Sequence, residues 1–173
     1  LAGQEAGTPE ERIALLRLIV ERYPNGPHAA QAYVRMAREY TDMGKMQEAR
    51  EACERALAAP HTAREAADAL RMLTNIHRQA GRTEEAIATA RRWFEVADAR
   101  QRFKAGEALF DMLNKSGRNA EARDVAAATL DAIRWFREEL GRSDPGRRAG
   151  TDTPLVRDAD VLEGRLKAFL ASR

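Results

Sequence analysis

Three glycines recur along this chain at nearly constant intervals, and each is followed five residues later by an alanine. The glycines are Gly44, Gly81 and Gly117, so the intervals are 37 and 36 residues. A fixed period in this range is typical of stacked helix pairs, in which each pair has an apolar face that only a neighbouring pair can cover. The period therefore predicts a helical array that acts by presenting a surface.

Small and large apolar residues recur at fixed distances from each glycine, on one face of the helix before it and one face of the helix after it. Small residues at the crossing points allow the two helices of a pair to approach closely. In the third copy Gly106 is small where a large residue is expected and Phe110 is large, which we interpret as a volume-conserving exchange. The three copies read Tyr33, Met36, Ala37, Tyr40, Ala49, Cys53, Ala56 and Leu57; Leu70, Leu73, Thr74, His77, Ala86, Ala90, Trp93 and Phe94; and Gly106, Leu109, Phe110, Leu113, Ala122, Ala126, Thr129 and Leu130.

This layout resembles the tetratricopeptide repeat over roughly residues 7–134. The resemblance implies an all-α fold, a right-handed solenoid of antiparallel helix pairs with about three and a half repeats. We expect the array to occupy residues 1–140. It would contain a partial repeat at 7–24 and repeats near 30–61, 67–98 and 103–134.

Capping signals mark the expected helix boundaries. Thr8 to Glu11 and Thr62 to Glu65 both read as capping boxes. The pattern from 119 to 140 is long enough to run past the last repeat, and we expect a linker at 141–153. A final amphipathic helix at 154–173 would cover the open end of the array; the alternative is a docking helix for a partner.

The charge balance argues against a dedicated polyanion binder, because 29 basic side chains face 27 acidic ones, for a net charge of +2. An arginine-rich stretch at 134–148 contains Trp135 and Phe136, a mixture that can suit nucleic acid. Since both aromatics also fit the buried face of a long helix, we do not expect nucleic acid as a partner. The single cysteine, Cys53, lies at a core position and predicts no disulfide.

No apolar stretch approaches the roughly 20 residues that span a bilayer, so no membrane span is expected. We expect a soluble protein, with the cytoplasm favoured over the periplasm. Alanine and arginine richness points to a bacterial source. The chain does not begin with methionine, and the partial repeat at 7–24 suggests a segment of a longer protein.

Recognisable catalytic or ligand-binding motifs are missing from the sequence. The three histidines, His28, His61 and His77, have no histidine or cysteine at metal-ligand spacing. Neither a nucleophile elbow nor a glycine-rich phosphate loop occurs. We therefore expect no enzyme activity, no cofactor and no metal.

Each repeat is a pair of helices, and the first helix of each pair would line the concave side of the array. These concave faces form the candidate binding groove. In the resembled family, a lysine and an asparagine of one repeat can hold a peptide's terminal carboxylate, and Arg71 and Asn75 resemble that pair. A protein or peptide partner with an acidic segment or a free C-terminal carboxylate would suit such a groove.

The function predicted is that of an interaction scaffold or adaptor. The alternatives are a sensor or oligomerisation module of a bacterial regulator, and a substrate-positioning domain of an enzyme. The predicted groove residues are Arg38, Arg71, Asn75, Arg78, Lys104, Glu107 and Asp111.

Overall fold

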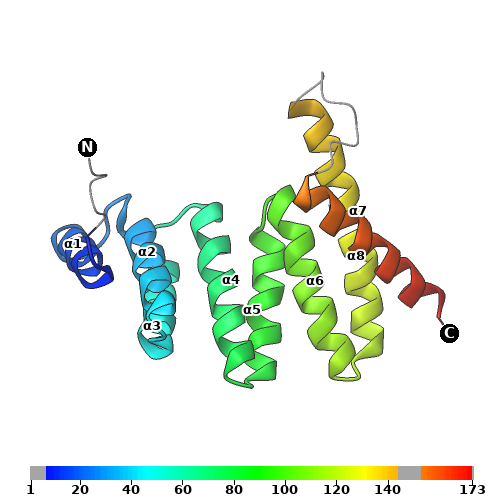
Figure 1. Ribbon diagram of the computed structural model, residues 1–173, viewed down its shortest axis with the longest axis horizontal. Helices are drawn as coiled ribbons and strands as arrows, with labels where there is room; N and C mark the ends of the chain where they lie inside the picture. The colour runs from blue at the N-terminus through cyan, green and yellow to red at the C-terminus, as the bar shows by residue number, and fades with distance from the viewer. Residues whose placement is uncertain (1–6, 144–152, 173) are drawn as a thin grey trace. The chain divides into compact units, whose positions relative to one another are not determined.

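The computed structural model describes residues 7–143 and 153–172, and these residues form helices without any strand (Figure 1). The predicted all-α fold of antiparallel helix pairs is confirmed. The chain divides into two compact units, Leu1–Arg82 and Thr83–Arg173, a division that the sequence did not predict. The helices are α1 (Pro9–Arg22), α2 (Ala29–Asp42), α3 (Met46–Ala58) and α4 (Ala63–Gln79) in unit 1, and α5 (Thr83–Val96), α6 (Ala99–Lys115), α7 (Asn119–Ser143) and α8 (Pro154–Ala171) in unit 2.

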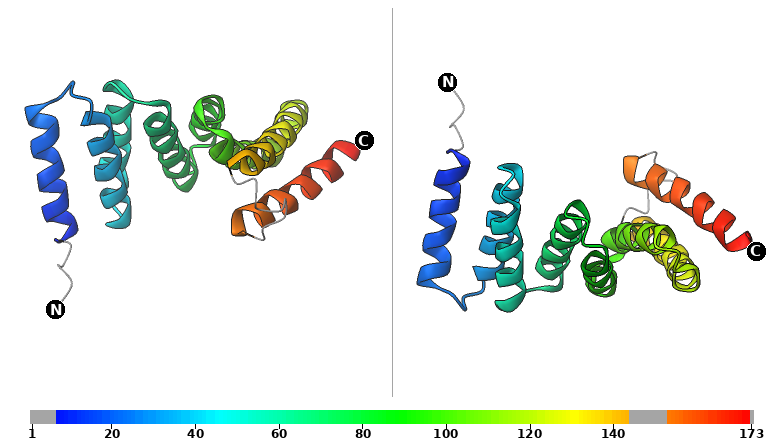
Figure 2. Two further views of the ribbon diagram at one scale, coloured as in Figure 1. Left: turned by 90° about the horizontal axis from the view of Figure 1, so that it is seen from above. Right: turned by 90° about the horizontal axis from the view of Figure 1, so that it is seen from below.

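Unit 1 is built around α2, which packs against α1, α3 and α4 (Figure 2). Ala37 on α2 and Ala49 on α3 are completely buried, so the small residues lie where the helices approach closely. Large side chains fill the space around these contacts. The core comprises Ile13, Val34, Met36, Ala37, Tyr40, Ala49, Ala52, Cys53, Ala56, Ala69, Met72, Leu73 and Ile76.

Both predicted capping boxes are present. Before α1, the Thr8 hydroxyl accepts a hydrogen bond from the Glu11 amide at 3.2 Å, and the Glu11 carboxylate accepts one from the Thr8 amide at 2.8 Å. Thr62 and Glu65 make the same reciprocal pair before α4. Each box satisfies two backbone groups that would otherwise be left unpaired at the helix start.

The three recurring glycines end α2, α4 and α6 in the same way. Their φ angles are 73°, 70° and 70°, in the left-handed region where a side chain is strained. After each glycine, an amide donates back to a carbonyl five residues earlier, as Lys45 does to Tyr40 at 2.8 Å. This glycine-dependent helix ending explains why the period is so clear in the sequence.

In unit 2, the volume left free by Gly106 is filled by side chains of neighbouring helices and not, as the sequence suggested, by Phe110. A Cβ on Gly106 would lie 2.1 Å from Thr129 Oγ1 and 3.0 Å from a ring carbon of Phe94, so α7 and α5 already fill this space. Phe110 does not fill the gap left by Gly106; it contacts Phe169 of α8, with ring centroids 4.9 Å apart. Gly106 thus permits close helix packing.

The helix α8 covers an apolar surface formed by α6 and α7, which confirms a C-terminal capping helix. Three side chains of α8 are at most 1% exposed and belong to the same core as Phe103 and Ile133: Ala159, Leu162 and Leu166. The helix α7 extends to Ser143, into the segment expected as a linker at 141–153, while residues 144–152 lie outside the described part. Within the described ranges, no helix is long and apolar enough to cross a membrane.

Candidate partner-binding groove

A hollow of about 200 Å³ lies between α2 and α4 in unit 1. It brings together three of the predicted groove residues, Arg38, Arg71 and Asn75. A fourth, Arg78, is exposed and donates a hydrogen bond to Asn75 Oδ1 at 3.3 Å. The lining consists of Arg38, Thr41, Asp42, Arg71, Met72, Asn75, Ile76 and Gln79.

Helical spacing explains why these side chains meet. On α4, Arg71, Asn75 and Gln79 are four residues apart and therefore share one face. Met72 and Ile76, at 7% and 4% exposure, belong to the core of unit 1 and provide apolar surface in the hollow. The hollow thus combines apolar surface with guanidinium and amide groups.

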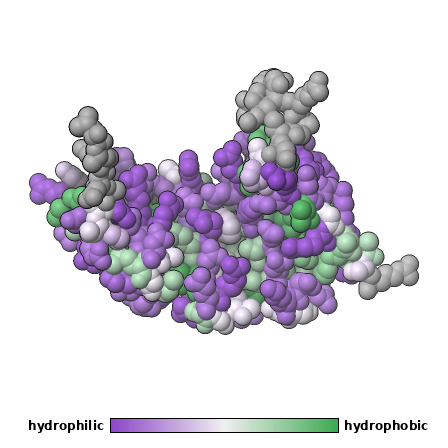
Figure 3. Space-filling view, viewed as in Figure 1, coloured by the Kyte–Doolittle hydropathy of each residue, from purple (hydrophilic) through white to green (hydrophobic). Residues whose placement is uncertain are grey.

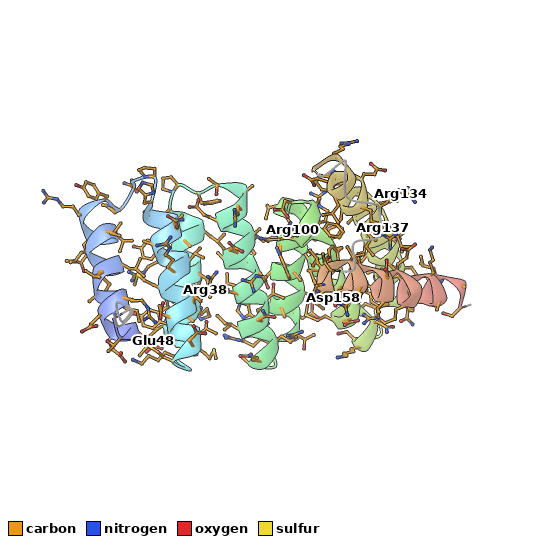
Figure 4. The ribbon with its side chains drawn as sticks, turned by 45° about the horizontal axis from the view of Figure 1, so that its top comes forward. Arg38, Glu48, Arg100, Arg134, Arg137 and Asp158 are labelled. Atoms are coloured by element: carbon orange, nitrogen blue, oxygen red, sulfur yellow. The ribbon has the colours of Figure 1, made fainter. Side chains whose placement is uncertain are left out.

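Glu39, which follows Arg38 in the sequence, forms an ion pair with Arg12. Arg12 on α1 donates two hydrogen bonds to Glu39, Nε to Oε1 at 2.9 Å and Nη2 to Oε2 at 2.6 Å. This bidentate pair holds the pKa of Glu39 below its ordinary value, with a smaller contribution from the charge of Arg38. Glu39 therefore already has a strong partner on α1. Figure 4 labels Arg38 on α2.

The three remaining predicted residues, Lys104, Glu107 and Asp111, lie on α6 in unit 2, where the structure pairs them with α8. Lys104 Nζ lies 2.6 Å from an oxygen of Asp158, which is labelled in Figure 4. Arg165 contacts Asp111 at 2.6 Å and Glu107 at 3.6 Å. These three predicted residues thus contact a helix of their own chain, because α8 carries opposite charges at matching positions.

Sequence reasoning left Asp42 and Gln79 out of the groove. Each lies one helical turn after a predicted groove residue, Asp42 after Arg38 and Gln79 after Asn75. Extending the predicted face by four residues would have found both. Asp42 adds a negative charge to a hollow that otherwise carries two positive ones.

The arginine-rich stretch buries only one of its two aromatic side chains, whereas the sequence analysis expected both on a buried face. Phe136 is buried at 2% exposure. Trp135 remains 39% exposed, and the guanidinium of Arg102 lies 5.1 Å from the centre of its ring. Arg137, labelled in Figure 4, binds Asp160 and Glu163 of α8 at 2.5 and 2.6 Å.

Arg134 pairs with Asp131 at 3.4 Å, whereas Arg147 and Arg148 lie outside the described residues. Among the residues that the structure describes, no group of three or more His, Cys, Asp or Glu side chains could hold a metal ion. The face shown in Figure 3 is mostly hydrophilic with small apolar patches.

Helix pairs in which the first helix ends in the same glycine turn, with a hollow between the first helices α2 and α4, are typical of a helical-repeat protein. Residues 30–59, which contain all of α3 and all but the first residue of α2, match the family model described as the tetratricopeptide repeat. This match confirms, over these residues, the resemblance inferred from the sequence.

Solved structures extend the likeness in fold to nearly the whole chain. The crystal structure of MamA is similar over 98% of this chain and 96% of that one, at 14% identity and a TM-score of 0.57. YrrB, described as a TPR protein with an unusual peptide-binding site, is similar over 94% of this chain and 81% of its own, at 19% identity and a TM-score of 0.58. No curated protein matches the chain in sequence.

Proposed function

We propose that this protein is an interaction scaffold that binds an acidic peptide segment, or a C-terminal carboxylate, in the hollow between α2 and α4. The observation that carries the proposal is the convergence of Arg38, Arg71 and Asn75 on one partly apolar hollow. Tetratricopeptide-repeat proteins are in general interaction modules without catalytic activity. The peptide-binding site named for YrrB, which shares this fold, is consistent with the proposal.

The size of the hollow favours a peptide over a cofactor. Small-molecule sites usually enclose roughly 300–1,000 Å³, whereas this hollow measures about 200 Å³. It can take one or two side chains of an extended chain that continues along the surface. Met72 and Ile76 would contact the apolar part of such a side chain.

The charges in the hollow define which peptide fits. A guanidinium group can hold a carboxylate through two parallel hydrogen bonds, and the amide nitrogen of Asn75 can donate a further one. Asp42 lies one turn beyond Arg38 and disfavours a second carboxylate at that end. A peptide with its acidic group at Arg38 and Arg71, and a neutral or basic group near Asp42, would match.

Fluorescence anisotropy with synthetic acidic peptides tests this proposal. Each peptide is made with a free and an amidated C-terminus, so that a terminal carboxylate can be separated from acidic side chains. Binding should weaken as salt rises, because exposed charges are screened over about 8 Å at physiological ionic strength. The Arg71→Glu variant should lose binding while keeping its helix content and melting temperature.

The matched control is Arg92→Glu, which makes the same charge change at an exposed site on α5. This control should bind as the parent protein does. Equal affinity of the parent and Arg71→Glu for every peptide bound would refute the hollow as the binding site. Retained binding by Arg71→Glu together with lost binding by Arg92→Glu would locate the partner surface in unit 2 instead.

A further inference from the structure

A second pocket of unit 1 lies between α1 and α3, which both pack against α2. Its volume is about 310 Å³. From α2 it is lined by Tyr33, Met36 and Tyr40, whose spacings of three and four residues place them on one face of the helix. The proposed peptide hollow is lined by Arg38 and Thr41 from the opposite face of α2, so this tyrosine pocket is a separate site.

The walls of the tyrosine pocket belong to α1, α2 and α3. On α1, Arg17, Val20 and Glu21 line it, and Val20 is 7% exposed on the buried face of that helix. The exposed side chains of Leu15 and Leu18 do not line it. Residues packed on the outer face of α1 would therefore leave the tyrosine pocket open.

Carboxylates outnumber guanidinium groups around the tyrosine pocket. The acidic side chains are Glu21, Glu48 and Glu51, and the basic ones are Arg17 and Arg55. The guanidinium of Arg17 donates a hydrogen bond to the Tyr40 hydroxyl at 2.7 Å, so it is already engaged within unit 1. The charges around the pocket thus favour a positively charged occupant.

Two of the three carboxylates are available to receive a cation. In the part of the chain that the structure describes, Glu21 and Glu48 have neither a hydrogen-bond nor an ion-pair partner. Glu51 accepts a hydrogen bond from the Gln47 side-chain amide at 2.9 Å. Glu48, labelled in Figure 4, lies in the first turn of α3. A cation in the tyrosine pocket would therefore meet two carboxylates that no other described side chain binds.

We propose that the tyrosine pocket binds the side chain of a lysine or arginine residue in a protein partner. The aliphatic stem of that side chain would pack against Met36 and the tyrosine rings, and its positive end would meet Glu21 or Glu48. Aromatic rings attract a cation placed over their faces, which adds to the selection of positive charge. This inference goes beyond the proposed function, because it assigns a second site, of opposite charge preference, to the other face of α2.

The size and exposure of the tyrosine pocket favour a side chain over a small molecule. Small-molecule sites usually enclose roughly 300–1,000 Å³, so a pocket of about 310 Å³ lies at the lower limit. Its three glutamates are exposed, so the pocket does not enclose its occupant. A long side chain can enter it while the backbone of the partner stays outside. Unit 1 would then hold an acidic segment in the peptide hollow and a basic one in the tyrosine pocket at the same time.

Nuclear magnetic resonance titration of the whole chain tests this proposal with three capped amino acids as probes. N-acetyl-lysine methylamide and N-acetyl-arginine methylamide carry the cation, and N-acetyl-norleucine methylamide carries an uncharged apolar side chain of similar length. The two cationic probes should shift the backbone amides around Met36, Tyr40 and Glu48 in a saturable way, with dissociation constants of about 1–10 mM for a single side chain. The norleucine probe should not do so, and added salt should weaken the binding of both cations.

Neutral substitutions of the same shape test the carboxylates of the pocket. Glu48→Gln should raise the dissociation constant for the lysine probe about two- to fivefold, because one exposed ion pair is lost. The matched control is Glu10→Gln. Glu10 and Glu48 both lie in the first turn of a helix, so both changes remove the same interaction with the helix dipole, but Glu10 does not line the pocket. This control should bind the probe as the parent does, and adding Glu21→Gln to Glu48→Gln should weaken binding further.

The Arg71→Glu variant separates this inference from the proposed function. It should bind the lysine probe as the parent does, and Glu48→Gln should bind acidic peptides as the parent does. Three results would overturn the inference. One is the absence of shifts around the tyrosine pocket at probe concentrations up to about 50 mM, well above the expected dissociation constants. The others are equal shifts with the norleucine probe, and an unchanged dissociation constant in the folded Glu21→Gln/Glu48→Gln double variant.

Discussion

Replacing Gly106 by alanine should destabilise unit 2, although alanine is the better helix former. The added Cβ would lie 2.1 Å from Thr129 Oγ1, 2.8 Å from Thr129 Cγ2 and 3.0 Å from Phe94 Cε2. Favourable contacts between carbon atoms begin near 3.5 Å. Either α6 must move away from α7, or the Thr129 side chain must change its position.

The size of the effect follows from three contributions. Alanine stabilises a helix interior by about 1 kcal/mol relative to glycine. Overpacking a closed core costs about 1–3 kcal/mol. Thr129 is completely buried, and its hydroxyl donates to the Val125 carbonyl at 2.7 Å; if the new methyl displaces this hydroxyl, leaving it unpaired costs about 1–3 kcal/mol more. The net loss in the free energy of unfolding should therefore be about 0–2 kcal/mol if the Thr129 hydroxyl keeps its partner, and about 1–5 kcal/mol if it is displaced.

Urea denaturation followed by circular dichroism measures this loss. The control is Gly164→Ala on α8, where nothing lies within 4 Å of the added Cβ; it should stabilise unit 2 by about 0.5–1 kcal/mol. Adding Thr129→Ala to Gly106→Ala removes two of the three close contacts. The double variant should therefore lose less than the sum of the two single changes. If Gly106→Ala stabilises the protein as much as Gly164→Ala does, the close packing of α6 on α7 is refuted.

Two further predictions concern the buried small residues and the thiol. Ala86→Leu should lower the free energy of unfolding by about 1–3 kcal/mol, because Ala86 is completely buried; a variant as stable as the parent in urea would contradict this packing. Burial raises the pKa of the Cys53 thiol from 9.0 to about 12. The stability linked to this shift is fully present below pH 9 and is lost as the pH rises towards 12, because the unfolded chain releases its proton first. A thiol reagent at pH 8 should accordingly label Cys53 only after urea unfolds the protein, and labelling at the rate of a free thiol without urea would contradict its burial.

The helices and their endings were predictable because local sequence determines them. The glycines at 44, 81 and 117 adopt positive φ angles that the chain needs at each helix end, and the threonines at 8 and 62 satisfy the first amides of α1 and α4. Apolar spacing then identified the buried face of each helix. The division between α4 and α5 was not predictable, because the repeat pattern continues through it without a change.

The environment of Gly106 shows where repeat spacing stops being informative. The sequence identified a missing large side chain and suggested Phe110, one turn later on the same helix, as compensation. In the structure Thr129 and Phe94 occupy that space, and both come from neighbouring helices. Spacing along one helix shows which positions point inward. Which partner meets each position depends on how the helices cross.

Repeat spacing also fails to show which partners the groove residues of α6 contact. Those partners bear on how the hollow in unit 1 could recognise a peptide. Lys104 and Asp111 meet partners 54 residues later in the sequence, at a separation that no repeat period specifies. The face of α6 thus binds a helix of its own chain through opposite charges and one aromatic contact. Arg38, Arg71 and Asn75 lie on the corresponding helix faces in unit 1. There they line a hollow, whereas the α6 residues form ion pairs with α8. Because α8 meets α6 through acidic and basic side chains at matched positions, a peptide with acidic groups spaced to meet Arg38 and Arg71 would use the same mode of recognition on α2 and α4.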